Sequence, residues 1–520
     1  MAQIQFKGKT FVQNHHLLVK YHELVPVKSK SLTDKVSLHD NLIIHGDNLK
    51  ALKALLPLYA GEIKCVYIDP PYNTGNENWA YNDNVNSPMM QEWLGKVVDR
   101  EDLTRHDKWL CMMTPRLKLL RELLRDDGVI FISIGDTEMH HLRMLMDEIF
   151  GPENLVGVFT WRRRINPDSR NQSGVSEDHE YVISYQRENS RFTGAPKDLD
   201  KYKNPDNDPR GDWMSMDMTG LANKEQRPNL HYTITNPKTG HAYDPPAQRG
   251  WAYSRDRMQQ MIANGEVLFP ENGKGRPRQK KFLKDLQSQT MGFSTWLDQG
   301  FTNTDGTRVM QEIFQKKIFD FPKPVELIQT LIGQVVSDTD IVLDSFSGSG
   351  TTAHAVLNLN EQDNSNRRFI LIECEDYADK VTAERVRRVI KGVPSAKDEA
   401  LKKGLGGSFS FFELGKSIEL ESILDGKNLP TYKELARYVF YTATGEEFDE
   451  KAINENKNFI GESKNYQVFL FYLPDIEKLK NLAFTLEMAN GLPALKKGET
   501  TACFRPDQVF GSGASGTKQY

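Results

Sequence analysis

The sequence has few cysteines and no long apolar run. Its 520 residues contain four cysteines, none of them in a Cys-x-x-Cys pair, which excludes a disulfide framework and offers no recognisable zinc-binding pattern. No apolar run approaches the ~18–20 residues that a membrane-spanning helix needs, and the N-terminus lacks the apolar core of a signal peptide. We therefore expect a cytoplasmic protein in a reducing compartment, with no membrane partner.

A large excess of charge of one sign is also lacking. The chain carries 67 Lys and Arg residues against 71 Asp and Glu residues, a formal net charge of -4, so a nucleic-acid partner would require a local basic surface. Two basic clusters are present, the first made of Arg162, Arg163 and Arg164 and the second, between Gly273 and Lys284, including Arg276, Arg278, Lys280 and Lys281. Such clusters line grooves that follow a phosphate backbone, but they also occur in solvated loops.

Composition and length predict a globular chain of several domains, with 38% hydrophobic and 27% charged residues. Apolar segments predicted as buried strands alternate with helical patterns in two parts of the chain, at 41–45, 63–68 and 129–134 and again at 340–344 and 368–373. One predicted helix begins at Pro115 and ends at Gly128. The alternation predicts an α/β fold in which two distant parts of the chain assemble one Rossmann-like sheet.

Periodicity is weak between the two parts, which predicts an irregular, β-rich insertion. The predicted organisation is an N-terminal extension (1–40), a first core part (41–190), the insertion (191–310), a second core part (311–415), a small C-terminal accessory domain (416–510) and a flexible tail (511–520).

The predicted strand 63–68 ends in the tetrapeptide Asp69–Tyr72, DPPY. A carboxylate, two prolines and an aromatic ring at a strand end could form a rigid site that accepts hydrogen bonds. A proline-stiffened turn is the equal alternative, because proline cannot continue the hydrogen-bond ladder of a strand.

A glycine-rich turn, FSGSG, follows Asp344 and precedes a helix predicted to begin at Thr351. Glycines let backbone amides approach a ligand, and a helix N-terminus favours a carboxylate or phosphate, so the turn suits a nucleotide-type cofactor. Glu373 ends the next predicted strand, where a carboxylate can accept both ribose hydroxyls. A tight connection without a ligand and a solvated strand-end glutamate remain as alternatives.

In this order, the motifs resemble those of the Mod subunits of type III restriction-modification systems, which are amino-group DNA methyltransferases of the β arrangement. The resemblance covers about residues 41–415 and rests on HGDNL (45–49), IDPPYNTG (68–75), SIGDTE (133–138), DHEYVISY (178–185), FPKPVELI (321–328), DSFSGSGTTAHAVLNLN (344–360) and RRFILIE (367–373). It implies a circularly permuted Rossmann-like methyltransferase that uses S-adenosyl-L-methionine, with residues 191–310 as target-recognition region.

The resemblance implies transfer of a methyl group to adenine N6 of duplex DNA. The amine lone pair is delocalised into the base, so hydrogen bonds must rotate it toward the methyl donor. Asp69 and the Pro70 carbonyl can accept the two N6–H groups, Pro71 stiffens the corner, and Tyr72 can stack on a base swung out of the duplex.

Cofactor contacts are also carried over from the resemblance. Phe346, Gly348, Gly350 and Thr351 would surround the methionine portion and the start of the helix, Glu373 would bind the ribose, Asp47 the adenine amino group, and Lys323 and Pro324 would complete the pocket beside Asp344. For Asp47, a helix N-cap is the alternative. Asp344 could equally orient the glycine turn.

Other chemistries are disfavoured by what is missing. No Pro-Cys pair offers the nucleophile of cytosine C5 methylation, no complete P-loop is present, and the adjacent histidine pairs do not predict a metal site. The open rivals are cytosine N4 methylation, methylation of RNA or of a protein amide, and a DNA-binding module without catalysis. The resemblance further implies a homodimer that can join a separate restriction (Res) subunit.

Overall fold

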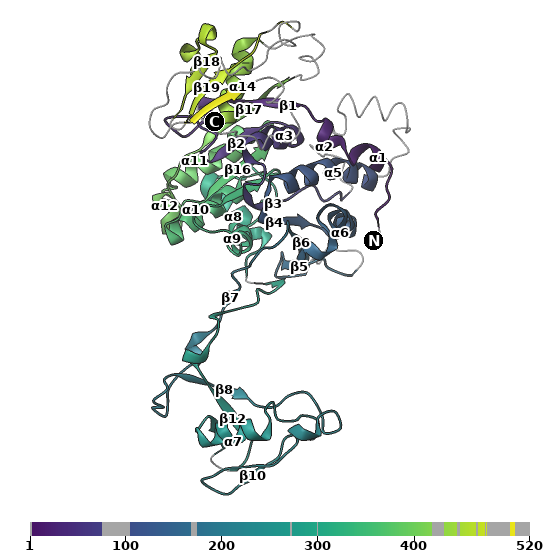
Figure 1. Cartoon of the computed structure of the whole chain (residues 1–520), viewed down its shortest axis with the longest axis vertical. Coiled ribbons are helices and arrows are strands. Elements are labelled where there is room, and N and C mark those ends of the chain that lie inside the picture. The colour runs from purple at the N-terminus through teal and green to yellow at the C-terminus, as the bar shows by residue number, and fades with distance from the viewer. Residues whose placement is uncertain are drawn as a thin grey trace. The chain divides into compact units, whose positions relative to one another are not determined.

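The computed structural model describes residues 3–74, 105–167, 174–270, 273–298, 300–418, 431–444, 448–463, 466–473, 475 and 500–504. Its internal contacts divide the chain into two compact units. The first unit consists of Met1–Phe192 with Ser294–Tyr520, and the second of Thr193–Phe293 (Figure 1). The first unit is therefore built from two stretches of chain that flank the second unit in the sequence.

A 10-stranded mixed sheet forms the centre of the first unit. Its strand order is β1 (Tyr21–Pro26), β17 (Ser410–Ile418), β2 (Leu42–His45), β16 (Arg368–Glu373), β15 (Ile341–Asp344), β3 (Ile63–Ile68), β4 (Leu124–Ile134), β6 (His179–Gln186), β5 (Leu155–Arg162) and β14 (Trp296–Leu297). The strands from β17 to β4 in this order are parallel, and β6 is antiparallel to both of its neighbours. Because β16 and β15 lie between β2 and β3, the centre of the sheet needs both stretches of chain.

Helices pack on this sheet in two groups. In one group, α5 (Arg105–Leu123) contacts both α3 (Asn48–Tyr59) and α6 (Asp136–Phe150). In the other group, drawn in green in Figure 1, α10 (Thr351–Asp363) contacts both α9 (Val325–Ile332) and α11 (Glu384–Lys391). The remaining helices of the sheet layer are α1 (Lys9–Val12), α2 (His15–Leu18), α8 (Asn303–Phe314), α12 (Glu399–Lys403) and a π-helix, η7 (Ala378–Ala383).

Both faces of the sheet are buried. Ile44, Val66 and Ile132 belong to the core cluster that includes α3, α5 and α6, whereas the intervening residues Ile43 and Phe131 are fully buried outside that cluster. Successive strand side chains point to opposite faces, so strands buried on both sides need continuous apolar runs. This is why the central strands could be predicted from the sequence as uninterrupted apolar segments.

The structure confirms a mixed α/β fold with a large sheet, but both predicted boundaries of one helix are wrong. The helix expected from Pro115 to Gly128 is α5, which begins at Arg105 and ends at Leu123. The chain passes directly into β4, where Leu124 pairs with Ile63 before the register shifts. Pairing with β3 therefore overrides the local helical pattern.

The second unit has short strands around a small core. A three-stranded sheet is formed by β11 (Val267–Leu268), β12 (Arg278–Phe282) and β8 (Trp213–Asp217), accompanied by α7 (Arg255–Ala263) and the two-stranded pairs β10 (Ala242–Tyr243) with β9 (Ile234–Thr235) and β13 (Thr290–Met291) with β7 (Ala195–Pro196). Met218, Trp251, Met258 and Met261 are completely buried in its core.

The C-terminal part of the first unit has its own apolar cluster, which includes Leu435, Ile460 and Val468. It combines α14 (Tyr432–Thr444) with a three-stranded sheet of β18 (Phe459–Glu462), β19 (Tyr466–Leu470) and β20 (Thr500–Phe504). The predicted tail, 511–520, lies outside the described residues. Among the helices that are described, none is both long and apolar enough to cross a membrane.

Candidate functional site

The corner Asp69–Tyr72 lies at the carboxyl end of the buried strand β3. The Trp109 indole of α5 donates a hydrogen bond to the Pro71 carbonyl at 2.7 Å, which ties the corner to the helix layer. The Tyr72 ring occupies the space that a side chain at Gly135 would need, since a Cβ there would lie 3.1 Å from Tyr72 Cδ2. Packing from two neighbouring elements therefore fixes both the backbone and the ring.

Lys323 reaches this corner from the second stretch of chain. Its ammonium donates to Asp69 Oδ1 at 2.9 Å and Oδ2 at 2.8 Å, and it lies 3.4 Å from Glu180 Oε2. It also sits 4.9 Å from the centre of the Tyr72 ring, within cation–π range. The sequence placed Lys323 next to the cofactor, whereas the structure places its charged end on the carboxylate of the DPPY motif.

Glu180 on β6 is the member of this cluster that sequence reasoning missed. Its carboxylate accepts a hydrogen bond from the Tyr72 hydroxyl at 3.0 Å and one from Arg163 Nη1 at 3.0 Å. Glu180 falls within the DHEYVISY motif, but nothing in the local sequence indicates that its side chain meets Asp69 and Lys323. One partly buried network thus joins two carboxylates, Asp69 and Glu180, to two cations, Lys323 and Arg163.

Opposing effects set the protonation of this network. Burial raises the pKa of Asp69, partly offset by Lys323. Burial works against the charge on Lys323, but Asp69 and Glu180 outweigh it and raise the Lys323 pKa. For Glu180, Lys323 and Arg163 outweigh burial and lower the pKa. Lys323 is therefore held as a cation and Glu180 as an anion around the acceptor oxygens of Asp69.

The glycine-rich turn follows β15, the neighbour of β3. Asp344 Oδ1 accepts from the Phe346 amide at 3.0 Å and Oδ2 from the Thr352 hydroxyl at 2.5 Å, so its side chain orients the turn and the start of α10. Gly348 and Gly350 have φ of 49° and 79°, which side chains rarely adopt, and a Cβ at Gly350 would lie 3.2 Å from the Thr382 carbonyl.

Glu373, at the end of β16, is 1% exposed and lies against the same turn. It accepts hydrogen bonds from three backbone amides, those of Gly348 at 2.7 Å, Cys374 at 3.0 Å and Glu375 at 3.1 Å. Burial nevertheless raises the pKa of Glu373 to about 7, and burial also raises that of Asp344 to about 7. Asp344 and Glu373 thus both accept hydrogen bonds from backbone amides of the turn.

Sheet register brings the corner and the turn together. In the parallel pair β3–β15, Val66 is level with Leu343, so the two strands end side by side, and Asp69 and the glycine-rich turn follow them at the carboxyl edge of the sheet. Asn48, in the HGDNL motif (45–49), is tied to the same turn. Its side-chain amide donates to the Ser345 carbonyl at 2.9 Å, and its side-chain oxygen accepts from Arg116 at 2.6 Å. Three sequence motifs therefore converge on one edge.

Asp47 caps α3, with its Oδ1 accepting from the Lys50 amide at 3.0 Å. It also lines an open cavity of about 340 Å³, together with His22, His45, Gly46, Lys50 and Glu413. The N-cap alternative is thus realised, and the carboxylate remains at the edge of a space that can take a ligand.

The predicted basic residues are placed in different environments. Arg162 is exposed, whereas Arg163 belongs to the Glu180 network. In the second unit, Arg276 and Arg278 are exposed and Lys281 is half-buried. Lys280 is 7% exposed.

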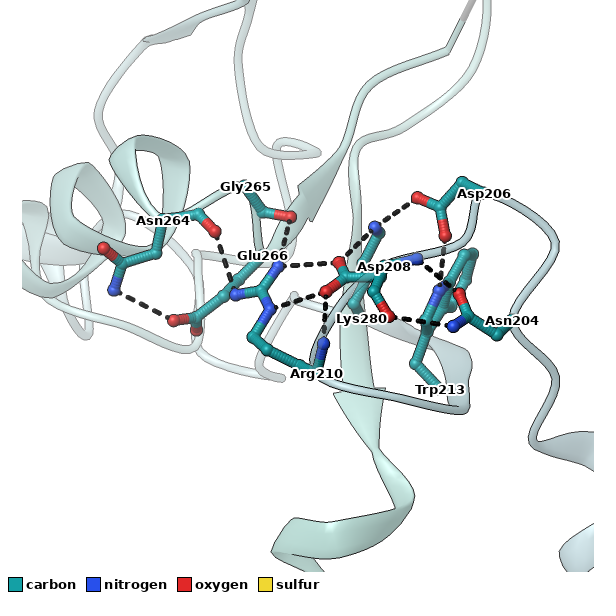
Figure 2. Close-up of polar contacts among 9 residues, drawn as sticks. All are labelled: Asn204, Asp206, Asp208, Arg210, Trp213, Asn264, Gly265, Glu266 and Lys280. Atoms are coloured by element: carbon teal, nitrogen blue, oxygen red, sulfur yellow. Dashed lines mark hydrogen bonds and ion pairs between the residues drawn. The ribbon is translucent and has the colours of Figure 1, made fainter.

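Figure 2 shows the polar network that surrounds Lys280. Its ammonium contacts Asp206 and lies 2.8 Å from Asp208 Oδ2, and Asp208 also binds Arg210 at 2.8 Å. Trp213 Nε1 donates to Asp206 at 2.9 Å. The structure therefore places Lys280 in the interior of its unit, where its charge is neutralised by aspartates and is not presented to a phosphate.

A group able to bind a metal is found where the sequence predicted none. Nδ1 of His106 lies 2.7 Å from Glu138 Oε1, and Nδ1 of His141 lies 2.8 Å from Oε2, with one ligand atom of each residue within 4.8 Å of the others. Asn73, which follows the DPPY motif, donates to the same fully buried carboxylate. In the structure these contacts satisfy Glu138 by hydrogen bonds and anchor Asn73. No spacing in the sequence indicates this group, because His106 lies on α5 whereas Glu138 and His141 lie on α6.

Taken together, a rigid acidic corner and a glycine-rich, acid-lined turn at one edge of a doubly covered parallel sheet define an α/β protein with a nucleotide-type site. The chain belongs to the N6/N4 DNA methylase family, whose model matches residues 63–384. The resemblance inferred from the motifs is thereby confirmed.

Two relatives with similar sequences agree with this assignment. The chain is 32% identical over 440 residues to the Mod subunit of the type III restriction-modification enzyme StyLTI of Salmonella typhimurium, covering 78% of this chain and 65% of that protein. It is 30% identical over 377 residues to the type II methyltransferase M.KpnI of Klebsiella pneumoniae, covering 68% and 85%. The PvuII DNA methyltransferase (cytosine-N4-specific) aligns with a TM-score of 0.33 at 14% identity, covering 68% and 89%. The chain spans about two thirds or less of the length of the type III relatives that it matches.

Replacing Lys323 should destabilise the fold. Lys323→Met leaves the carboxylates of Asp69 and Glu180 without their shared cation, so the free energy of unfolding, measured by urea denaturation, should fall by about 3–5 kcal/mol. Lys317→Met is the matched control, because it removes only an exposed ion pair with Asp320 and should cost less than about 1 kcal/mol. Equal losses for both variants would show that the Lys323 network is not specially stabilising.

Glu373 should make stability depend on pH. Its pKa is raised from 4.5 to about 7, so the native state holds the proton more tightly than the unfolded chain. The stability contributed by this group is full below pH 4.5 and is lost as the pH rises through about 7. Thermal unfolding between these pH values should show a falling midpoint, and Glu373→Gln should flatten part of that fall. Glu361→Gln, an exposed control on α10, should leave the slope unchanged.

Proposed function

We propose that this protein transfers a methyl group from S-adenosyl-L-methionine to adenine N6 at a specific sequence in duplex DNA. The observation that carries the proposal is that Asp69 and the glycine-rich turn follow adjacent parallel strands at one sheet edge, with Lys323 and Tyr72 held around the acceptor oxygens. Membership of the N6/N4 DNA methylase family supports it.

The turn is chemically suited to the proposed cofactor, which would supply an electrophilic methyl group bound to a sulfonium. Within the described residues, the buried hydroxyls of Ser345 and Ser347 have no hydrogen-bond partner. Gly348 and Gly350 leave the turn without side chains at two positions, and Glu373 ends the adjacent strand. We propose Phe346, Gly348, Gly350, Thr351, Glu373 and Asp47 as the cofactor contacts, with Asp344 and Pro324 supporting them.

Asp69 and the Pro70 carbonyl would accept the two N6–H groups of the adenine, which turns the nitrogen lone pair toward the methyl donor. Lys323 already occupies both Asp69 oxygens, so the amine must share them with the ammonium. When the carbon–nitrogen bond forms, the carbon–sulfur electrons stay on sulfur and one N6 proton is lost through Asp69 to solvent. Tyr72 would stack on the base, which must leave the duplex to reach the corner.

Cytosine N4 methylation is the second candidate, because the family covers both exocyclic amines. Asp69 rather than serine at the first motif position favours adenine, by resemblance to the Mod subunits. The acceptor geometry itself suits either amine.

We propose the second unit, Thr193–Phe293, as the target-recognition part of the predicted insertion, inserted between the two halves of a circularly permuted core. Its exposed Arg276 and Arg278 and the half-buried Lys281 are the proposed phosphate contacts, together with Arg162 and Arg164 of the first unit. A homodimer, a Res partner subunit and action in the cytoplasm are proposed from the similarity to type III Mod subunits.

Methylation-aware sequencing tests the function directly. Host DNA exposed to the wild-type protein should carry N6-methyladenine at one sequence motif, and Asp69→Ala should abolish the mark because the amine loses its acceptor. Calorimetry should show that the variant still binds S-adenosyl-L-methionine, since Asp69 lies on the corner and not in the glycine turn. A mark on cytosine N4 would select the second candidate, and an unchanged mark with Asp69→Ala would remove Asp69 from catalysis.

The neighbours Lys280 and Lys281 offer a matched test of DNA contact. Lys281→Ala should weaken binding of the motif duplex and reduce the slope of log affinity against log salt by about 1, measured by fluorescence anisotropy. Lys280→Ala should instead lower the thermal unfolding midpoint, because it removes the cation that Asp206 and Asp208 share. The opposite pattern would contradict the assignment of the two side chains.

A further inference from the structure

The segment Phe319–Pro324 runs from the glycine-rich turn to the corner Asp69–Tyr72. At its beginning, the Phe319 ring packs edge-on against Tyr377 at 5.6 Å, and its Cζ would lie 3.3 Å from a Cβ placed on Gly348. Near its end, Lys323 binds both oxygens of Asp69. The segment therefore bridges the two halves of the proposed active site.

The middle of the segment is also held in place. The Pro322 carbonyl lies so close to Gly306 of α8 that a Cβ there would be 2.2 Å from it. Contacts with three different parts of the structure thus hold Phe319, Pro322 and Lys323. The backbone conformation of Phe321, directly before Pro322, follows from these attachments.

Phe321, within this anchored segment, is exposed and strained. Its side chain is 79% exposed, and its φ is 54°, a left-handed conformation that a bulky non-glycine residue adopts only at a cost. So exposed a phenyl group gains little from packing against the described residues. Strain of this kind persists where the surrounding structure imposes it, and it occurs most often at functional sites.

A second exposed apolar side chain lies close in sequence to the other cation that binds Glu180. Glu180 binds Lys323 on one side and Arg163 on the other, and Ile165, two residues after Arg163, is 62% exposed. Each cation of the Glu180 network is therefore two residues from an exposed apolar group.

We propose that Phe321 enters the base stack of duplex DNA and fills the space left by the target base when that base occupies the Asp69 corner. This inference rests on the proposed function. Extruding a base leaves its neighbours unstacked, and an apolar wedge such as phenylalanine inserted between base steps compensates for the lost stacking. A ring carried by a backbone segment that is anchored two residues away, at the lysine on Asp69, is suited to that place.

The test compares two substrates, both containing the motif found by sequencing. One is a fully matched duplex, and the other has an abasic site opposite the target base, so that the base is already unpaired. On the matched duplex, Phe321→Ala should lower kcat/KM about ten-fold or more, whereas Phe321→Trp should stay within about three-fold of wild type because it preserves stacking. On the abasic duplex, Phe321→Ala should recover to within about three-fold of wild type.

Leu17→Ala is the control, since it truncates an exposed apolar side chain of α2, 62% exposed, and should leave both activities unchanged. The inference is overturned if Phe321→Ala is as active as wild type on the matched duplex, or equally impaired on both duplexes. A change in oligomeric state of Phe321→Ala, measured by light scattering, would also overturn it, by assigning the ring to contact between copies of the chain. Absence of methylation by the wild-type protein would instead overturn the proposed function.

Discussion

The ion pair between Lys323 and Asp69 joins two stretches of chain that are 254 residues apart. Both groups are largely removed from water, and a charge buried without its partner is costly, so neither stretch can adopt this arrangement alone. Glu180 and Arg163 extend the pair into a balanced set of charges. The corner after β3 and the segment before α9 therefore hold each other in position. Any site at this edge of the sheet depends on their association.

The parallel sheet explains why the motifs converge. Parallel strands end at the same edge, and the crevice outside their carboxyl ends is where α/β sheets bind ligands. The DPPY corner follows β3 and the glycine turn follows the adjacent β15, while Glu373 ends β16 on the other side of β15. The apolar interiors of the strands hold the sheet together, and the residues just beyond their ends remain available for chemistry.

Neighbouring basic residues in the sequence differ in burial in the structure. Lys280 and Lys281 are neighbours on β12, and successive strand side chains point to opposite faces, so one lies among aspartates inside its unit and the other nearer the surface. Arg163 similarly lies on Glu180, next to the exposed Arg162. Local charge density indicates that a basic surface is available, but burial decides which cations contribute to it.

The sequence by itself determined the central strands, the acidic corner and the glycine turn, because continuous apolar runs, proline and glycine act through local backbone and burial preferences. Only the tertiary structure decided that α5 ends at Leu123, that Glu180 faces Lys323, and that His106 meets Glu138. These features depend on strand pairing and on side chains that meet across long separations in the chain. Such contacts form only when elements pack, so no local pattern encodes them.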